Sequence, residues 1–531
     1  MNMLPACLFD IKLSRTELLA LPKPENPKIL RLLVLRNHAF EYVASLLNIF
    51  LGQIGLQALY SYSDYDDSLN FPKNFFEREH DAVLLWIDAT RYTIPDFCLW
   101  LKTRLSVICA LTKTPILVFV FGKKILENLN QGSILAINVD KILASLGDKA
   151  FDARLAPLSG TLLSAKAILE MARNIALTIL PKFFLQPLKA IILDCDETLY
   201  KGVLEEEGIN GVTPFIQLQT YLKKLKEEGF LLCLSSKNEE YALKQLFEER
   251  NDFPLRWSDF AKIKINWKKK SENIREIAKE INIGEDALLF IDDNLGELLD
   301  VSNALPSVHL LPAGSEDETL HRLRYYPFLQ KKETNFEDII RTKDILANQK
   351  RNALHMNLSK DEYRRTLKIH LTIFINPIEQ INRITELLNK TNQFIFCYLR
   401  PTLNDVETFL TQKEKVCITC AMEDALSKSG IIACGLFTKK DDLLRVSELT
   451  VSCRALGRDV ETGLLFYLLN LACKNLSAKK IELPFKKGPK NKPALQWLEN
   501  KWPGSIFHEK AIANMLALTD DLNDIQIEII E

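Results

Sequence analysis

The amino-acid sequence predicts an α/β protein of three domains, with two doubly wound parallel sheets followed by a mixed α+β domain. The chain has 531 residues, which is too many for one compact core, because single cores stop growing at about 250–300 residues. Short apolar runs alternate with helical stretches over the first two thirds of the chain, as in parallel sheets covered by helices. The last third mixes strand-like and helical segments, which is typical of an α+β module.

The first domain is expected to span residues 1–185 and the second residues 186–335. The strands expected in the first are Ile29–Leu35, Asp81–Ile87, Pro115–Phe121 and Ile134–Val139, with a helix over Ala39–Phe50. The strands expected in the second are Ala190–Leu193, Phe230–Leu234 and Ala287–Ile291.

The helices of the second domain have recognisable start and stop signals. Thr213 and Pro214 read as a cap residue and a first-turn proline, and Gly229 reads as the end of the same helix. Asn238 is expected to cap a helix over Glu239–Arg250, and a further helix is expected over Ser271–Ile281. One helix and its connections fill the stretch between Asn238 and Lys270 in this prediction.

Residues 336–365 are charged and weakly periodic, and we expect a helical linker there. The third domain would span residues 366–531. Its expected strands are Val416–Cys420, Gly430–Phe437 and Leu443–Val451, and its expected helices are Glu461–Lys474 and Lys492–Lys501.

The composition is that of an ordinary soluble protein, with 47% hydrophobic and 26% charged residues. The formal net charge of −1 favours neither a nucleic acid nor an anionic membrane as a partner. The eleven cysteines are scattered without the spacing of a zinc site. No signal-peptide layout and no apolar run of about 18 residues is found, so we expect a cytoplasmic protein.

The most informative segment is Ile191–Tyr200, in which an apolar run ends in an Asp-x-Asp-x-Thr loop. Open parallel sheets bind ligands at the carboxyl ends of their strands, where this loop would lie. Asp194 can attack phosphorus and ligate a metal, and Asp196 can pass a proton to and from the leaving oxygen. Together with the Thr198 hydroxyl, this pairing favours phosphoryl chemistry.

Three further loops of the second domain would meet at the same edge. Ser235-Ser236-Lys237-Asn238 offers a hydroxyl for a phosphate oxygen, and Trp267–Ser271 offers lysines that neutralise charge. Asp292-Asp293-Asn294 would complete a site for a hard cation, for which magnesium fits best. Each of these loop sequences taken alone is common in a turn or at the start of a helix. Four of them in order, each after a predicted strand, favour an active site.

These motifs resemble the haloacid dehalogenase (HAD) superfamily, and within it the FkbH-like proteins of phosphatase subfamily IIIC. The resemblance makes Asp194 the nucleophile, Asp196 the acid and base, and Ser236 the residue that holds phosphate. The motif lysine is Lys270, and Asp292 is a magnesium ligand with Asp293 beside it. The expected magnesium ligands are Asp194, Asp196, Asp292 and Asp293, and Thr198 is a further expected catalytic residue.

Two departures from the FkbH-like pattern are present. Tyr200-Lys201 stands where that subgroup usually has Trp-Gly, and Ser235 stands where it commonly has a cysteine. The stretch between Asp196 and Thr213 is too short for an inserted cap domain, so the site is expected to be open to a large or carrier-tethered substrate.

In the third domain, Ser452–Glu461 is expected to be a loop that opens a helix and offers free N–H groups to a pyrophosphate or a phosphopantetheine. Arg454, Gly457 and Arg458 suit that task, although the charge of Asp459 would repel pyrophosphate. The segment resembles the cofactor loop of GNAT-type acyltransferases and the matching loop of FkbH-like proteins. By the same resemblance Asn491 lies in the late helix of that module, and Cys453 is either an acyl-carrying thiol or a structural cysteine.

The first domain resembles the SGNH-like domain of longer FkbH-like proteins. A hydrolase of that type needs a serine after the first strand, but Leu35-Arg36-Asn37-His38 has none. We therefore expect a structural, non-catalytic domain in which His38 lies at the surface or in a cap.

The resemblance implies a bifunctional enzyme that acts on an acyl phosphate such as 1,3-bisphosphoglycerate. It would release phosphate through an aspartyl-phosphate and load the glyceryl group onto the phosphopantetheine of an acyl carrier protein, for polyketide-type biosynthesis. One alternative is a plain HAD phosphatase that acts on another small or carrier-bound phosphorylated substrate. A second is a non-catalytic scaffold that binds a carrier protein.

Overall fold

The structure is a computed structural model whose described residues form three large β-sheets, one within each of the three residue ranges expected to form a domain, and a separate two-stranded sheet. It describes residues 3–10, 13–23, 25–69, 71, 73–122, 129, 133–154, 156–332, 347–348, 350–351, 354–355, 357–452, 455, 458, 460–488, 490–501, 506–508, 511, 514, 522 and 525–530. By the density of internal contacts the chain divides into two compact units. Met1–Leu225 and Leu232–Thr334 form the first unit, and Lys226–Leu231 and Asn335–Glu531 form the second.

The first sheet is parallel, with the strand order β2-β1-β3-β4-β5. Its strands are β1 (Lys28–Arg36), β2 (Leu56–Tyr65), β3 (Ala82–Asp88), β4 (Ile116–Phe121) and β5 (Ile134–Ile137). The edge strand β2 was not predicted, because tyrosines and serines alternate along it and it lacks a continuous apolar run. The last strand is shorter than predicted, since Val139 begins a helix that the Asn138 side chain caps.

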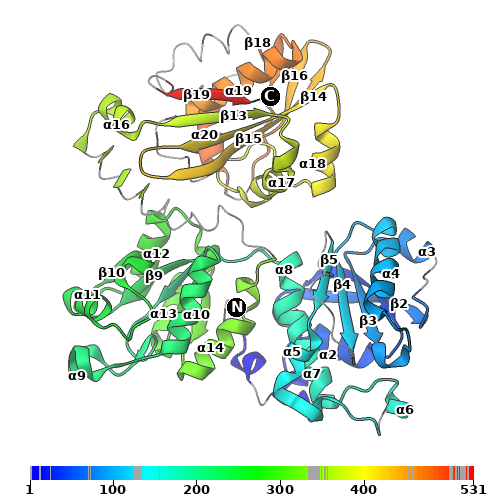
Figure 1. Ribbon diagram of the computed structural model, residues 1–531. Coiled ribbons are helices and arrows are strands. Elements are labelled where there is room, and N and C mark those ends of the chain that lie inside the picture. The colour runs from blue at the N-terminus through cyan, green and yellow to red at the C-terminus, as the bar shows by residue number, and fades with distance from the viewer. Residues whose placement is uncertain are drawn as a thin grey trace. The chain divides into compact units, whose positions relative to one another are not determined.

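Helices cover both faces of this sheet, as a doubly wound fold requires. The apolar face that contains Leu33, Leu85 and Val118 packs against α4, whereas Phe40 at the start of α2 packs against Trp86 on the opposite face. Figure 1 shows the helices that lie around this sheet. The helices of this region are α1 (Arg15–Leu19), α2 (Glu41–Gln53), α3 (Asn74–Glu77), α4 (Phe97–Leu111), α5 (Val139–Leu143), α6 (Ala156–Ser159), α7 (Ala165–Asn174) and α8 (Pro181–Phe184).

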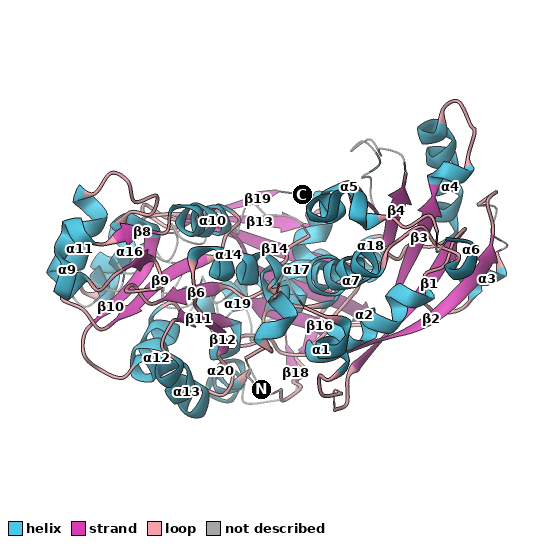
Figure 2. Ribbon diagram, turned by 90° about the horizontal axis from the view of Figure 1, so that it is seen from below, coloured by secondary structure: helices cyan, strands magenta, loops and turns pink. Residues whose placement is uncertain are grey.

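The second sheet has the strand order β10-β9-β6-β11-β12, with β6 at its centre. Its strands are β6 (Ala190–Leu193), β9 (Leu231–Ser236), β10 (Phe260–Ile265), β11 (Leu288–Asp292) and β12 (His309–Pro312). Its helices are α9 (Leu204–Gly211), α10 (Ile216–Glu227), α11 (Glu240–Glu249), α12 (Lys270–Glu280), α13 (Leu295–Ala304) and α14 (Glu316–Tyr325). Figure 2 shows α10 and α14 on one face of this sheet and α12 and α13 on the other.

Two predictions for this region were wrong. Thr213 and Pro214 do not start a helix: they form β8 (Thr213–Pro214), which pairs with β7 (Tyr200–Lys201), and α10 begins only at Ile216. A proline is compatible with such a short two-stranded ribbon because the ribbon has free edges.

The strand β10 was also missed. Lys262 and Lys264 interrupt its apolar pattern, and they form ion pairs with Glu280 and Glu276 of α12 at 2.6 and 2.8 Å. β10 is the edge strand of the sheet, where lysines prevent pairing with another chain.

The third sheet is mixed, with the strand order β18-β17-β16-β15-β14-β13-β19. Its strands are β13 (His370–Ile375), β14 (Lys415–Glu423), β15 (Lys428–Lys440), β16 (Leu443–Val451), β17 (Lys480–Glu482), β18 (Ile506–His508) and β19 (Gln526–Ile530). The helices α17 (Ile381–Lys390) and α18 (Leu403–Leu410) pack on the face that contains Cys417 and Cys434. α19 (Glu461–Leu476) packs among residues of the opposite face, and α20 (Lys492–Lys501) has the bounds that were predicted.

Much of the expected linker, residues 336–365, lies outside the described residues, and α16 (Lys360–Leu367) begins within its last part. Within the part of the chain that the structure describes, no helix combines the length and the apolar character needed to cross a membrane.

Candidate active site

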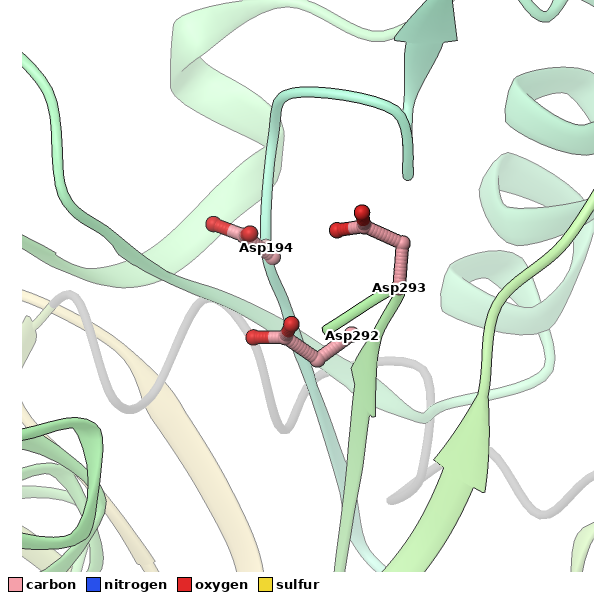
Figure 3. Close-up of side chains that lie close together, drawn as sticks. All are labelled: Asp194, Asp292 and Asp293. Carbon is pink, nitrogen blue, oxygen red and sulfur yellow. The ribbon is translucent and has the colours of Figure 1, made fainter. Parts of the chain in front are cut away.

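Three carboxylates meet at the carboxyl ends of two adjacent strands. Asp194 directly follows β6, and its backbone N–H donates to the carbonyl oxygen of Ile291 at 3.0 Å, which places it beside Asp292 at the end of β11. Asp194, Asp292 and Asp293 each offer a ligand oxygen, and these oxygens all lie within 4.8 Å of one another. Figure 3 shows the three carboxylates gathered at the ends of their strands.

Burial and the proximity of like charges shift the pKa values of two members of this cluster, Asp292 and Asp293. Burial and the neighbouring Asp194 raise the pKa of Asp292 to about 7, and the same two causes raise the pKa of Asp293. Asp292 has no exposed surface, so water cannot screen its charge. A divalent cation would relieve this repulsion, and an all-oxygen donor set of carboxylates suits magnesium.

Lys270 supplies a positive charge to the same cluster. Its Nζ lies 2.7 Å from Oδ1 of Asp194 and 2.6 Å from Oδ2 of Asp292, and the residue is 3% exposed. Burial alone would lower the pKa of this ammonium, but the two aspartates outweigh it and the pKa is raised. Of the three consecutive lysines only Lys270 is buried, because it begins α12, whereas Lys268 and Lys269 face solvent.

The loop after β9 reaches the same carboxylates. Ser236 donates its hydroxyl to Oδ1 of Asp194 at 2.6 Å. Asn238 donates its amide to Oγ of Ser236 at 3.1 Å and to Oδ2 of Asp196 at 3.0 Å. The prediction that Asn238 caps the following helix was therefore wrong. Its side-chain amide instead links Asp196 to Ser236, which in turn binds Asp194.

Asp196 is held at one side of the carboxylate cluster and is not one of the three clustered ligands. Its Oδ1 accepts from the Tyr200 hydroxyl at 2.6 Å and from the backbone N–H of Leu204 at 3.1 Å. Tyr200 was identified only as a departure from the FkbH-like pattern, and here it orients the expected acid and base. Thr198 is buried, and its Oγ1 has no hydrogen-bond partner within the described residues.

The expected cofactor loop of the third sheet is described only in part. Cys453, Arg454 and Gly457 lie outside the described residues. Arg458 is described and is 1% exposed: it lies 3.2 Å from Asp424 and donates to Oγ of Ser429 at 2.6 Å. Its guanidinium is thus occupied by partners inside the domain.

Asn491 is likewise occupied by partners within the domain. It donates to the carbonyl oxygens of Ile395 and Lys486, both at 3.0 Å, and accepts from the N–H of Gly488 at 2.8 Å. It thereby holds the segment 394–396 beside β16, where Ile395 forms an antiparallel bridge with Thr450.

A buried carboxylate fastens the same segment. Glu448 has no exposed surface and accepts hydrogen bonds from the backbone N–H groups of Phe396, Cys397 and Leu399 at 3.1, 2.9 and 2.7 Å. Burial raises its pKa despite these bonds, which favour the charged form.

Near the end of β1 the polar groups form hydrogen bonds with neighbours in the same domain. Asn37 accepts from the backbone N–H of Asp88 at 2.7 Å, and its amide donates to the Asp88 carbonyl oxygen at 3.1 Å and to the Tyr92 hydroxyl at 3.3 Å. His38 was expected at the surface or in a cap, but it is 3% exposed, stacks on Trp86 and contacts Thr161 at 3.2 Å, and the N-cap of α2 is Phe40. The prediction was wrong because the ring fills a space among aromatic side chains of the core.

Comparison with known proteins finds distant structural likenesses only. No family model matches the chain, and no curated protein matches it. The N-terminal part of the protein BF1531 from Bacteroides fragilis, solved with magnesium and described as containing a phosphatase domain, is 20% identical. That match covers 58% of this chain and 96% of that one, with a TM-score of 0.47.

Two structures of the aminoglycoside acetyltransferase AAC(6')-Ib match a smaller part of the chain. The one with coenzyme A is 18% identical, covers 24% of this chain and 81% of that one, and has a TM-score of 0.19. The one with coenzyme A and kanamycin is 16% identical, covers 27% and 98%, and has a TM-score of 0.20. Likeness at this level does not assign an activity, which has to be inferred from the side chains.

Proposed function

We propose that the chain is a magnesium-dependent phosphatase that works through an aspartyl-phosphate on Asp194. One observation carries this proposal: three carboxylates, a buried lysine and a serine hydroxyl converge at the end of the central strand of a parallel sheet. A structural role does not explain two buried aspartates side by side, because their repulsion destabilises the folded chain. Phosphoryl transfer needs this combination of a nucleophile, cations and a proton carrier.

Each residue then has a task in the reaction. Asp194 attacks phosphorus and the bond to the leaving oxygen breaks, while Asp196 gives that oxygen a proton. Water next attacks the aspartyl-phosphate, Asp196 takes the proton of that water, and inorganic phosphate and free Asp194 result. Ser236 and Lys270 bind oxygens of the phosphoryl group as its charge shifts.

Magnesium would be held by Asp194, Asp292 and Asp293. When bound, it screens the repulsion between the anionic nucleophile and the anionic phosphate. The site suits magnesium because its donors are three carboxylates. Their excess of negative charge agrees with the raised pKa of Asp292.

The finer proposal rests on the FkbH-like resemblance. In it, the Asp194 site hydrolyses the phosphate ester of a compound such as 1,3-bisphosphoglycerate. A thiol attacks the acyl carbon of the same compound, expels the second phosphate and forms a glyceryl thioester, which an acyl carrier protein accepts on its phosphopantetheine. Cys453 is the candidate thiol, and Arg454, Gly457, Arg458 and Asn491 are the candidate residues for the phosphopantetheine.

A plain phosphatase is the second candidate, and one observation favours it. The two described members of the candidate phosphopantetheine set, Arg458 and Asn491, already bind partners of their own domain. Their polar groups would have to exchange those partners before they could hold a carrier arm.

One experiment separates these candidates. The full-length protein is incubated with magnesium, 1,3-bisphosphoglycerate and a phosphopantetheinylated carrier protein, and both released phosphate and the intact mass of the carrier are measured. Phosphate release with a glyceryl mass on the carrier supports the transferase. Phosphate release without a mass gain across several carriers supports the plain phosphatase, and no magnesium-dependent release from any phosphorylated substrate contradicts both.

A further inference from the structure

An ion pair bridges the strand that carries the nucleophile. Lys237 directly follows β9, and its Nζ pairs with a carboxylate oxygen of Glu297 in the first turn of α13, which follows β11. In the sheet, β9 and β11 are the two neighbours of β6. The pair therefore joins the loops on either side of Asp194 at the edge where ligands bind.

This pair can exchange partners, unlike the pair of Lys270 with its aspartates. The side chains of Lys237 and Glu297 are 37% and 18% exposed, and ion pairs with this much contact with water are held weakly. The Lys270 side chain is 4% exposed and lies between two carboxylates, so it shares its charge with them even when it contacts a phosphoryl oxygen. Lys237 is the cation that the loop after β9 can release to a ligand.

The charge of the site indicates why a second lysine is needed. One divalent cation and the Lys270 ammonium together balance Asp194, Asp292 and Asp293, even before Asp196 is counted. A phosphoryl dianion would enter without a countercharge. Lysine binds phosphate as a point charge on a flexible stem, so Lys237 can follow the ligand without a fixed geometry.

We propose that Lys237 binds the phosphoryl group of the substrate and that Glu297 holds this lysine in place until substrate arrives. The proposal rests on the phosphatase function proposed above and assigns that site a substrate-binding residue. On entry, a phosphoryl oxygen replaces the Glu297 carboxylate as the partner of the ammonium. Glu297 is thus a positioning residue that competes with the substrate for one cation.

The competition gives opposite effects for the two partners. Lys237→Met removes the cation and should weaken binding of inorganic phosphate about tenfold, the size of one charge-assisted hydrogen bond. Glu297→Gln removes the competitor and should tighten binding about threefold, as expected for a weak ion pair. A purely structural bridge is broken equally by either change, so both variants would shift phosphate binding in the same direction.

The test uses the full-length protein with magnesium. Calorimetric titration with inorganic phosphate gives the dissociation constant, and hydrolysis of p-nitrophenyl phosphate gives kcat and KM. Lys237→Met should raise KM and change kcat within about twofold, and Lys237→Arg should recover most of the affinity. Lys264→Met is the matched control, because Lys264 forms ion pairs with Glu276 and Glu280 in the same domain and with none of the three clustered aspartates.

Opposite shifts in Lys237→Met and Glu297→Gln, with Lys264→Met unchanged, support the proposal. Shifts in the same direction, or phosphate binding equal to that of the unsubstituted protein in both variants, overturn it. Calorimetry reads phosphate binding without turnover. A chain that binds phosphate but hydrolyses nothing would therefore refute the proposed function and still decide the role of Lys237.

Discussion

The first and second sheets are both parallel, five-stranded and doubly wound, yet their carboxyl edges differ in charge. At the edge of the first sheet the Asn37 side chain forms hydrogen bonds with the backbone of Asp88 and with the Tyr92 hydroxyl. At the edge of the second sheet Asp194, Asp292 and Asp293 face one another as like charges with a single buried lysine among them. Both sheets offer a carboxyl edge where a ligand could bind. The excess negative charge of the three aspartates distinguishes the candidate active site from the hydrogen-bonded network of the first sheet.

The strongest test of this difference is the nucleophile. Asp194→Asn should reduce magnesium-dependent phosphate release by roughly 10⁴-fold, because an amide cannot attack phosphorus. Asp88→Asn is the matched control at the edge of the first sheet and should change release by no more than about twofold. Continuous phosphate assays on both variants make the comparison, and normal turnover in Asp194→Asn would contradict the assignment.

A smaller effect is expected on the stability of the second sheet. Lys270→Met leaves two buried carboxylates without their cation and should lower the free energy of unfolding by about 3–5 kcal/mol in the absence of magnesium. Magnesium should recover part of this loss, since it supplies the missing charge. Urea denaturation with and without magnesium measures both effects. Lys269→Met, at a solvent-facing neighbour, should stay within about 0.5 kcal/mol, and an equal loss there would refute the explanation.

Acid should lower the stability of the first sheet through His38. Burial of this side chain lowers its pKa to about 4. The unfolded chain takes up this proton near pH 6.5 and the folded chain only near pH 4. The free energy of unfolding therefore falls as the pH drops through this window, by roughly 3 kcal/mol. Urea midpoints of the unsubstituted protein at pH 7 and pH 5 should show this slope, and His38→Phe should flatten it. A slope that is unchanged in the variant would assign the acid response to other groups.

The pH response of the second sheet has the opposite sign. Burial and Asp194 raise the pKa of Asp292 to about 7, so the stability that its protonated form contributes without metal is lost as the pH rises through about 7. Magnesium requires the ionised form, and its affinity should fall about tenfold per pH unit below 7. Calorimetric titration with magnesium at pH 6 and pH 8 measures this difference. Equal affinity at both values would show that Asp292 is ionised throughout.

The sequence predicted best those elements whose signal is local. β6 and β16 have the predicted bounds, because β6 is a continuous apolar run and apolar residues recur along β16 between polar ones. β10 was missed because its lysines find their carboxylate partners on α12, which follows it. The start of α10 was misplaced because Thr213 and Pro214 pair with β7, a contact that no local rule contains.

The same distinction explains the prediction of the site. Asp194, Ser236 and Asp292 come together because each ends a strand of one sheet, which the order of loops along the chain already implied. The partners of Asn238 and Tyr200 lie across loops and could be identified only in three dimensions. Magnesium binding, the carrier protein and the thiol remain predictions, as do the boundaries of the three domains.

The hydrogen bonds around Glu448 have a consequence for any extended molecule that approaches the third sheet. Phe396 donates to the carbonyl oxygen of Leu449, and Val451 donates to that of Phe394, so the segment 394–396 already pairs with this stretch of the β16 edge. A peptide that pairs with the same backbone groups must displace the segment 394–396 and break its hydrogen bonds to Glu448. The binding free energy of such a peptide would be the difference between the free energies of the two pairings. Weakening the pairing of segment 394–396 would therefore strengthen binding of the peptide without any new contact.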